Sequence, residues 1–223
     1  MSPTLLEAPP AGVRANGRTP PPARPTGGGD DHEGEPGPRR PVMANAQLAT
    51  MFVIAAETMF FAGLIFSFLI LRVGAAVWPP PLQPRLPLGM TAVNTLVLLA
   101  SSAVMVRAVR SLGAGDRAAV LARLGGAAGL GALFLTVQGF EWARLIRFGL
   151  TVSSGAYGAT FYTLIGAHAA HVGFALTWLA VAWILAARGR VDARQPAALK
   201  ACAMYWHFVV ALWPVIWVSV YLV

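Results

Sequence analysis

The sequence predicts an all-α, polytopic membrane protein, a bundle of five transmembrane helices, and two features carry that prediction. Of the 223 residues, 57% are apolar and only 12% are charged, whereas soluble domains carry about 25% charged residues. The apolar residues gather in five long segments, at 47–71, 88–106, 121–140, 157–187 and 201–223. Because roughly 20 residues of helix cross the hydrocarbon core of a bilayer, each segment is expected to span the membrane once.

The third segment is the least regular of the five. Arg123 lies near its start, and its middle is rich in glycine. An arginine in this position can lay its stem along apolar surface while its charged end reaches water, so we still expect a span. The stretches between the segments are expected to be loops. Residues 78–87, WPPPLQPRLP, contain five prolines and cannot form a helix.

The first 44 residues form a region of a different kind. Residues 1–41 hold ten of the seventeen prolines. No apolar stretch is followed by a small-residue cleavage site, which argues against a signal peptide. Too few apolar side chains occur to offset the entropy of ordering this stretch. We therefore predict a disordered Pro/Gly/Arg-rich cytoplasmic tail at 1–44 and a transmembrane domain at 45–223.

The distribution of charge predicts the orientation. The tail and the two connectors around 107–123 and 188–200 carry thirteen of the seventeen basic residues. The positive-inside rule places these regions in the cytoplasm, so the N-terminus is expected inside and the C-terminus outside. This pattern accounts for the net charge of +8, and no nucleic-acid partner is expected. The single cysteine, Cys202, excludes an internal disulfide.

Glu57 is the eleventh of the 25 residues in the first segment, near the middle of the membrane. A charged side chain at that depth costs about 2.5–3.5 kcal/mol on insertion scales, so it normally faces protein or water. Its neighbours in AAETMFFAG offer no partner cation, and burial without one favours the protonated acid. Two interpretations remain open, a proton-linked carboxyl and a neutral acid hydrogen-bonded to another helix.

Gln138, Glu141 and Arg144 are spaced three residues apart at the end of the third segment. This spacing puts them on one helical face. Because the segment ends there, the expected role of Glu141 and Arg144 is an ion pair at the membrane boundary.

Tryptophans near segment ends are suited to the membrane–water boundary, and Trp78, Trp142 and Trp213 occupy such positions. We regard Trp78, together with Arg72 and Trp206, as candidates for contact with lipid or with a partner subunit.

Three histidines lie within the predicted spans. His168 and His171 occur in GAHAAHVGFALTW, and His207 occurs in YWHFVVALW. From the residues alone, two roles are open. The histidines can be ligands of a metal or haem held between facing helices, or they can join helices by hydrogen bonds, as polar side chains in membranes do.

Five blocks of the sequence, in order, resemble subunit III of the cytochrome c oxidases, in the haem–copper superfamily. They are ETMFFAG, LPLGMTAVNTLVLLASS, QGFEWARL, SGAYGATFYTLIGAHAAHV and YWHFVVALWPVIWVSVYL. The resemblance covers about residues 46–221. The chain is similar to the five-helix bacterial form, which lacks the first two of the seven helices in longer members.

The resemblance implies an accessory subunit of a complex that reduces O2 to water and pumps protons. It implies that subunits I and II are partners and carry the haems and the copper, so no cofactor, metal or catalytic residue is expected in this chain. It further implies bound phospholipid, support of proton uptake by subunit I, and a place in the bacterial inner membrane. An arm as long as the tail could reach another subunit of a respiratory complex.

The resemblance also extends to single residues. Glu57 matches the family's buried, carbodiimide-reactive glutamate. His168 and His171 match its paired histidines, for which the family implies packing and hydrogen bonding beside lipid. Three positions depart from the family pattern: Ala169 stands for a glycine, and Ser154 and Val210 stand for aspartates.

Alternative functions remain. A quinol oxidase subunit III and a nitric-oxide-reductase accessory protein belong to the same class, and Glu57 and the AYGATFY block favour the cytochrome c branch over the first. From a different class, a stand-alone proton-linked carrier would account for Glu57 and the histidines. The internal repeats and interrupted helices typical of transporters are missing from the sequence, however.

Overall fold

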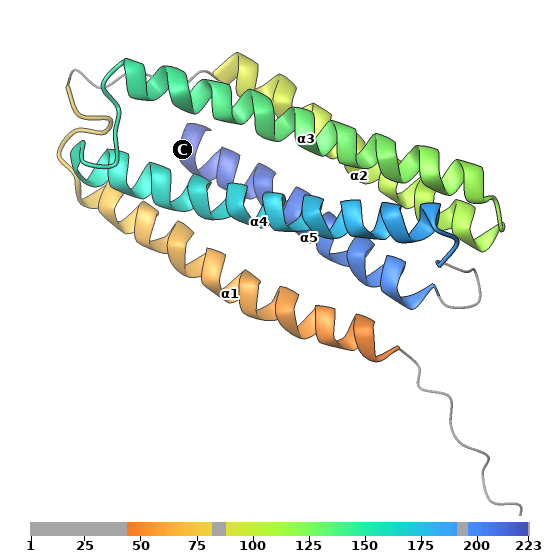
Figure 1. Cartoon of the computed structure of the whole chain (residues 1–223). Helices are drawn as coiled ribbons and strands as arrows, with labels where there is room; N and C mark the ends of the chain where they lie inside the picture. The colour runs from red at the N-terminus through yellow and green to blue at the C-terminus, as the bar shows by residue number, and fades with distance from the viewer. Residues whose placement is uncertain (1–43, 82–87, 191–195, 223) are drawn as a thin grey trace, which may run out of the picture. The chain divides into compact units, whose positions relative to one another are not determined.

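The structure, a computed structural model, describes residues 44–81, 88–190 and 196–222. Five helices account for nearly all of these residues: α1 (Asn45–Gly74), α2 (Leu88–Gly113), α3 (Arg117–Arg147), α4 (Gly155–Ala187) and α5 (Ala197–Trp217), the last continued by a π-helical turn, η1 (Val218–Leu222) (Figure 1). No strand occurs in the described residues, and all five helices are long and apolar enough to cross a membrane. The predicted fold class is confirmed. The tail predicted at 1–44 lies outside the described residues, apart from Ala44.

Several helices extend beyond the predicted apolar segments, as α1 does at both of its ends and α3 at both of its ends. α3 begins at Arg117, where the Asp116 side chain caps its first turn and accepts a hydrogen bond from the backbone at 3.0 Å. Gly115, at φ 74, supplies the left-handed turn that ends α2. The Arg117 guanidinium then reaches α4 and donates to the carbonyls of Ala186 and Ala187 at 3.2 and 2.6 Å. These bonds satisfy carbonyls at the C-terminal end of α4.

α5 is the helix around which the others pack. It contacts α1, α2 and α4, while α2 and α3 form the most extensive single pair. Half of the most apolar window of α5 is buried inside the chain, against 11% of that of α1. α1 therefore lies at the margin of the packed helices (Figure 1), and most of its surface is left for lipid or another protein.

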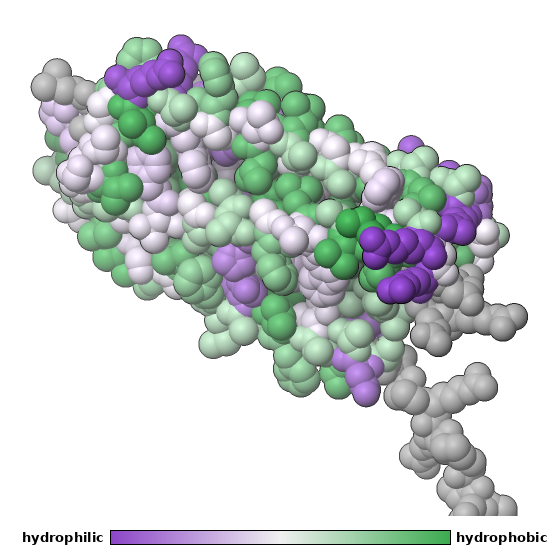
Figure 2. Space-filling view, in the orientation of Figure 1, coloured by the Kyte–Doolittle hydropathy of each residue, from purple (hydrophilic) through white to green (hydrophobic). Residues whose placement is uncertain are grey.

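The outer surface has the polarity expected of a membrane protein. Figure 2 shows apolar and weakly polar residues over the middle of the visible face, with the most hydrophilic residues mainly toward its two ends. On α1, only Thr50, Phe61 and Phe68 are buried. Because the exposed residues of α1 are almost all apolar, water is a poor solvent for this face.

Polar side chains join the more deeply packed helices. The Asn94 amide on α2 donates to the carbonyl of Phe134 on α3 at 3.0 Å. The Trp213 indole on α5 donates to the Thr95 hydroxyl on α2 at 2.8 Å. Both bonds are buried, and such bonds contribute about 0.6–2 kcal/mol each between membrane helices.

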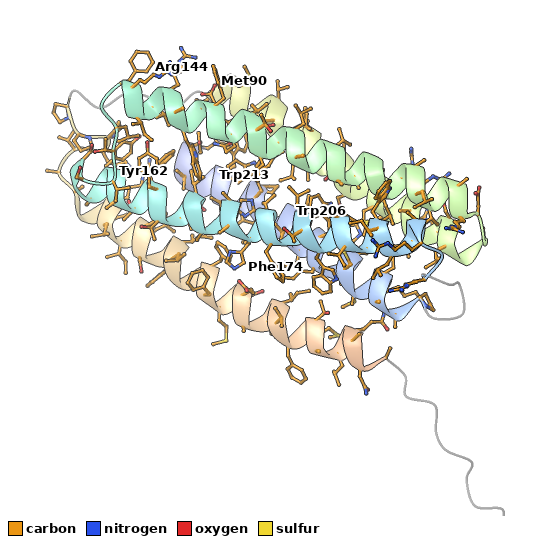
Figure 3. The ribbon with its side chains drawn as sticks, in the orientation of Figure 1. Met90, Arg144, Tyr162, Phe174, Trp206 and Trp213 are labelled. Atoms are coloured by element: carbon orange, nitrogen blue, oxygen red, sulfur yellow. The ribbon has the colours of Figure 1, made fainter. Side chains whose placement is uncertain are left out.

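Trp206 and Trp213 require a correction to the sequence-based predictions. Both side chains are fully buried, and Figure 3 places them within the bundle. Trp206 therefore contacts neither lipid nor a partner subunit, and Trp213 does not lie at the membrane boundary. The reason is a gap in α3: Gly131 has no side chain, and the Trp206 ring fills the space where a Cβ would lie.

This contact generates a test. Gly131→Ala would place a methyl group against the Trp206 ring, and overpacking of this kind costs about 1–3 kcal/mol. Gly129→Ala, two residues away on α3, meets nothing within 4 Å and is expected to be neutral or slightly stabilising, because alanine favours helix. Unfolding of both variants in mixed detergent micelles measures the difference. Equal stabilities for the two variants would contradict the packing described.

Candidate functional site

The chemically most distinctive part of the chain lies where α1 faces α4 and α5. Two adjoining pockets of about 340 and 300 Å³ share Val53, Phe174 and Tyr205 as walls, and together they form one groove, called here the α1 groove. Its larger part is lined mostly by alanines and aromatic rings, and Phe174 lies between α4 and α1 (Figure 3). Its smaller part reaches Glu57 and His171. A mostly apolar channel therefore leads to a pair of ionisable side chains.

Glu57 and His171 are in direct contact across this groove. The Glu57 carboxylate oxygen Oε2 lies 2.5 Å from Nε2 of His171, and the two side chains are 23% and 21% exposed. This is the one ion-pair contact among the described residues. The sequence neighbours of Glu57 offered no partner, and the structure supplies one from α4 instead. Glu57 is therefore in polar contact with another helix, and both interpretations of its role stay predictions.

The second nitrogen of His171 fixes the number of protons in this pair. Nδ1 lies 2.6 Å from the carbonyl oxygen of Ala167, and a carbonyl only accepts hydrogen bonds, so Nδ1 carries a proton. The Nε2···Oε2 contact then needs one further proton, on either atom. The pair is therefore a neutral acid beside a neutral imidazole, or a carboxylate beside an imidazolium. Its net charge is zero in both forms, which lowers the cost of placing it in a membrane.

Aromatic rings surround the pair on the α1 side. The Phe61 ring lies edge-to-face with the His171 ring, with centroids 5.0 Å apart, and the Phe60 ring stacks on His171 at 6.1 Å. Phe61 is fully buried. The contact between α1 and α4 thus combines one polar link with the packing of two α1 rings on the His171 ring.

His168 has surroundings different from those of His171. It is 1% exposed and stacks on the Trp213 ring, with centroids 5.1 Å apart and an interplanar angle of 27°. Neither ring nitrogen has a hydrogen-bond partner among the described residues. The expected packing role is therefore observed for His168, and the expected hydrogen-bonding role is not.

His207 joins two helices by a hydrogen bond. Its Nδ1 lies 2.6 Å from the Ser102 hydroxyl on α2. His171 and His207 thus each contact a polar side chain of another helix. The histidines contact different helices, and within the described part of the chain no three His, Cys, Asp or Glu side chains are grouped so as to hold a metal ion.

Gln138 and Glu141 occupy the other end of the bundle. Both are buried on α3, at 3% and 4% exposure. The expected ion pair of Glu141 with Arg144 is absent from the described residues: Arg144 is exposed, and its guanidinium lies 5.7 Å from the Phe148 ring centroid. α3 is rotated so that Glu141 faces inward, toward Tyr221 of η1, while Arg144 faces out.

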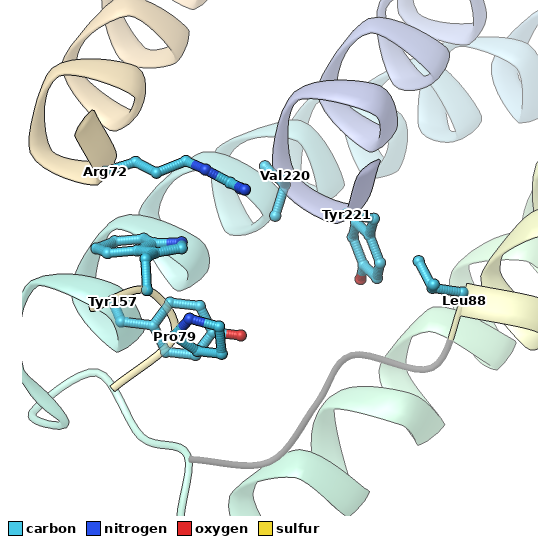
Figure 4. A pocket seen from close by; sticks show the side chains of 7 residues that line it. Arg72, Pro79, Leu88, Tyr157, Val220 and Tyr221 are labelled. Carbon is cyan, nitrogen blue, oxygen red and sulfur yellow. The ribbon is translucent and has the colours of Figure 1, made fainter. Parts of the chain in front are cut away.

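Arg72 and Trp78 lie in a third pocket, which they share with Tyr157 and Tyr221. Figure 4 shows Arg72 extending from the last turn of α1 across this pocket. The expectation of a lipid or subunit contact thus remains a prediction for these two residues, and it is not met for Trp206.

Sequence reasoning missed Ser102 and Tyr205. Ser102 lies in the LLASS block and Tyr205 immediately precedes the Trp–His pair of α5, so both are visible as polar residues in apolar segments. Their partners are not visible, because the Ser102–His207 bond joins positions 105 residues apart. Rotation of each helix about its axis decides such partners, and a segment that is apolar on all faces carries little signal of that rotation.

Comparison with known proteins decides the family. Residues 37–223 match the family model described as cytochrome c oxidase subunit III. This chain belongs to the cytochrome c oxidase subunit III family. It is similar to cytochrome c oxidase subunit 3 of Synechocystis, with 34% identity over 76% of this chain and 72% of the relative. It is also similar to subunit 3 of Bacillus subtilis, with 32% identity over 80% and 86%, and to that of Sus scrofa, with 31% identity over 81% and 70%.

Membership of this family places the chain in a haem–copper oxidase. As a subunit III it is one component of an oxidoreductase complex with other oxidase subunits. Its five long apolar helices make it a multi-pass membrane protein. Aerobic respiration and proton translocation are the processes of the family.

The Glu57–His171 link can be measured by a double-mutant cycle. Glu57→Ala and His171→Ala should together cost less than the sum of the two single changes, with a coupling of about 0.6–2 kcal/mol in the free energy of unfolding. Glu57→Ala with His207→Ala is the control, because His207 bonds to Ser102 and not to Glu57. This second cycle should show no coupling, and equal coupling in both cycles would contradict the assigned partners.

Proposed function

We propose that this chain is a non-catalytic accessory subunit of a proton-pumping cytochrome c oxidase. It carries no redox centre, binds phospholipid, stabilises subunit I and supports proton uptake by that subunit. Subunits I and II are its partners and cytochrome c is the electron donor. The main support for the proposal is the α1 groove. This mostly apolar groove leads to the Glu57–His171 pair, whose net charge is zero.

Lipid binding is supported by the surface of α1 and by the groove. α1 exposes a long run of large apolar side chains, including Phe52, Met59, Phe66, Ile70 and Val73. The larger part of the groove has walls of alanine, Phe174 and Trp178. Water gains few hydrogen bonds on such walls, so an acyl chain is the favoured occupant.

The stabilising role is supported by the incomplete packing of α1. A helix with only three buried residues depends on further contacts for its place in a membrane complex. α1 also presents aromatic and branched side chains that suit packing against other helices. We place subunit I against part of this face and lipid against the rest.

Orientation follows from charge. The end of the bundle at which α1 and α5 begin also holds Arg107, Arg117, Arg123 and Arg188. The positive-inside rule supports a cytoplasmic place for this end. In a bacterial inner membrane, the N-terminus then lies in the cytoplasm and α1 ends near the periplasm.

The Glu57–His171 pair is assigned a structural role in this proposal. A relay must release its proton to a next acceptor, and the pair is instead held at both ends, by Ala167 and by α1. A shift of the proton shared between Nε2 and Oε2 moves charge only within the pair. Support of proton uptake is therefore indirect, through the position of α1 beside subunit I.

Glu57→Gln tests the structural role in the assembled oxidase. The Gln amide can donate to Nε2 of His171 and preserve the link, but it cannot release a proton. We expect reconstituted vesicles of this variant to keep nearly the full proton-to-electron ratio. Glu57→Leu is the matched variant that breaks the link, and it should lower the amount of this subunit that co-purifies with the haem-bearing subunits. A Gln variant that assembles normally and loses most of its proton pumping would contradict the structural role.

A further inference from the structure

The end of the bundle opposite the α1 groove contains a separate pocket, of about 310 Å³. It lies where α1 ends, where α4 begins and where η1 closes the chain, and its walls include Arg72, Trp78, Tyr157, Val220 and Tyr221 (Figure 4). These residues come from three stretches of the sequence, at 72–78, 157 and 220–221. The pocket is therefore a product of the fold and not of one loop.

The charge in this pocket is unbalanced. The Arg72 guanidinium points across it, and the lining residues that the structure describes include no carboxylate. Among the described residues, Arg72 forms no ion pair and no side-chain hydrogen bond. A half-buried guanidinium has five N–H donors, and at a membrane boundary it favours the binding of an anion that accepts from them.

The walls of the pocket hold a fixed shape. The Trp78 ring lies edge-to-face with Phe68 and with Tyr157, at centroid distances of 5.7 and 5.1 Å. Tyr157 is 4% exposed, and its ring lines the pocket beside Arg72. Its hydroxyl has no hydrogen bond to another described residue. The Tyr157 ring is thus held in place beside Arg72, which reduces the entropy that this side chain loses when a ligand binds.

We propose that this pocket binds a phosphate group, with the Arg72 guanidinium as a two-pronged donor and the Tyr157 hydroxyl as a second donor. Guanidinium and phosphate match in geometry and charge. Two sources supply this chemistry, the headgroup of a phospholipid and free phosphate. If the phosphate belongs to a phospholipid, the site adds a headgroup position to the lipid binding proposed above, and this version of the inference rests on that proposal.

The test uses the complete oxidase purified in mild detergent, with phospholipids per complex counted by native mass spectrometry. Arg72→Gln should lose one phospholipid relative to the wild type, Tyr157→Phe should weaken its retention, and Arg72→Lys should retain part of it. Arg144→Gln is the matched control, because Arg144 lies near the same end of the bundle with its guanidinium over Phe148. The control should keep the full lipid count.

A second arm distinguishes the two sources of phosphate. Equilibrium dialysis of lipid-depleted complex against labelled inorganic phosphate should show weak binding that Arg72→Gln reduces about 10-fold or more, as expected for a lost charge-assisted pair. Arginine-dependent phosphate binding with an unchanged lipid count would identify free phosphate as the ligand. Unchanged lipid and phosphate binding in both Arg72→Gln and Tyr157→Phe would overturn the site. A wild-type complex without any bound phospholipid would contradict the lipid binding proposed for the groove and leave the phosphate arm to decide this pocket.

Discussion

The contact between Glu57 and His171 is the interaction on which the position of α1 depends. Only three residues of α1 are buried, so area alone fixes neither its rotation nor its height against α4 and α5. In a membrane, apolar burial drives little helix association, because lipid tails are as apolar as the side chains they replace. One polar link at a defined depth, with Phe60 and Phe61 packed beside it, supplies the specificity that the apolar face lacks.

The same principle explains the rest of the bundle. Neighbouring helices are joined by a few polar bonds within close packing: Asn94 to Phe134 between α2 and α3, and Trp213 to Thr95 and Ser102 to His207 between α2 and α5. Each pairs a group whose desolvation would otherwise be costly. The Glu57–His171 pair differs because it contains ionisable groups. The proton shared between Nε2 and Oε2 keeps the net charge of the pair at zero. The pair can therefore link two helices without a large desolvation penalty. The unpaired Arg72 lies instead at the end of α1, beyond the middle of the membrane, where an anion from outside the chain can balance it.

Much of the fold was predictable from the sequence, and the partners of its polar residues were not. The first segment, predicted at 47–71, is the helix Asn45–Gly74. The prediction succeeds because the thickness of the bilayer core sets the length of an apolar segment. The family followed from ordered blocks of residues. The pairing of Glu57 with a histidine, the absence of a Glu141–Arg144 pair and the burial of Trp206 depend on helix rotation. Small residues decide that rotation: Gly131 admits the Trp206 ring, and no periodicity in so apolar a helix reveals it.

The central claim is that the polar link between Glu57 and His171 holds α1 against α4. Its most direct test is the distance between the two helices in lipid nanodiscs. Double electron–electron resonance measures this distance between spin labels at the exposed positions Phe52 and Val181. His171→Leu should broaden the distance distribution, because the apolar contacts alone do not fix α1. Thr177→Val, which removes a hydroxyl bonded within its own helix, should leave it unchanged. A His171→Leu distribution that coincides with that of the wild type would contradict the claim.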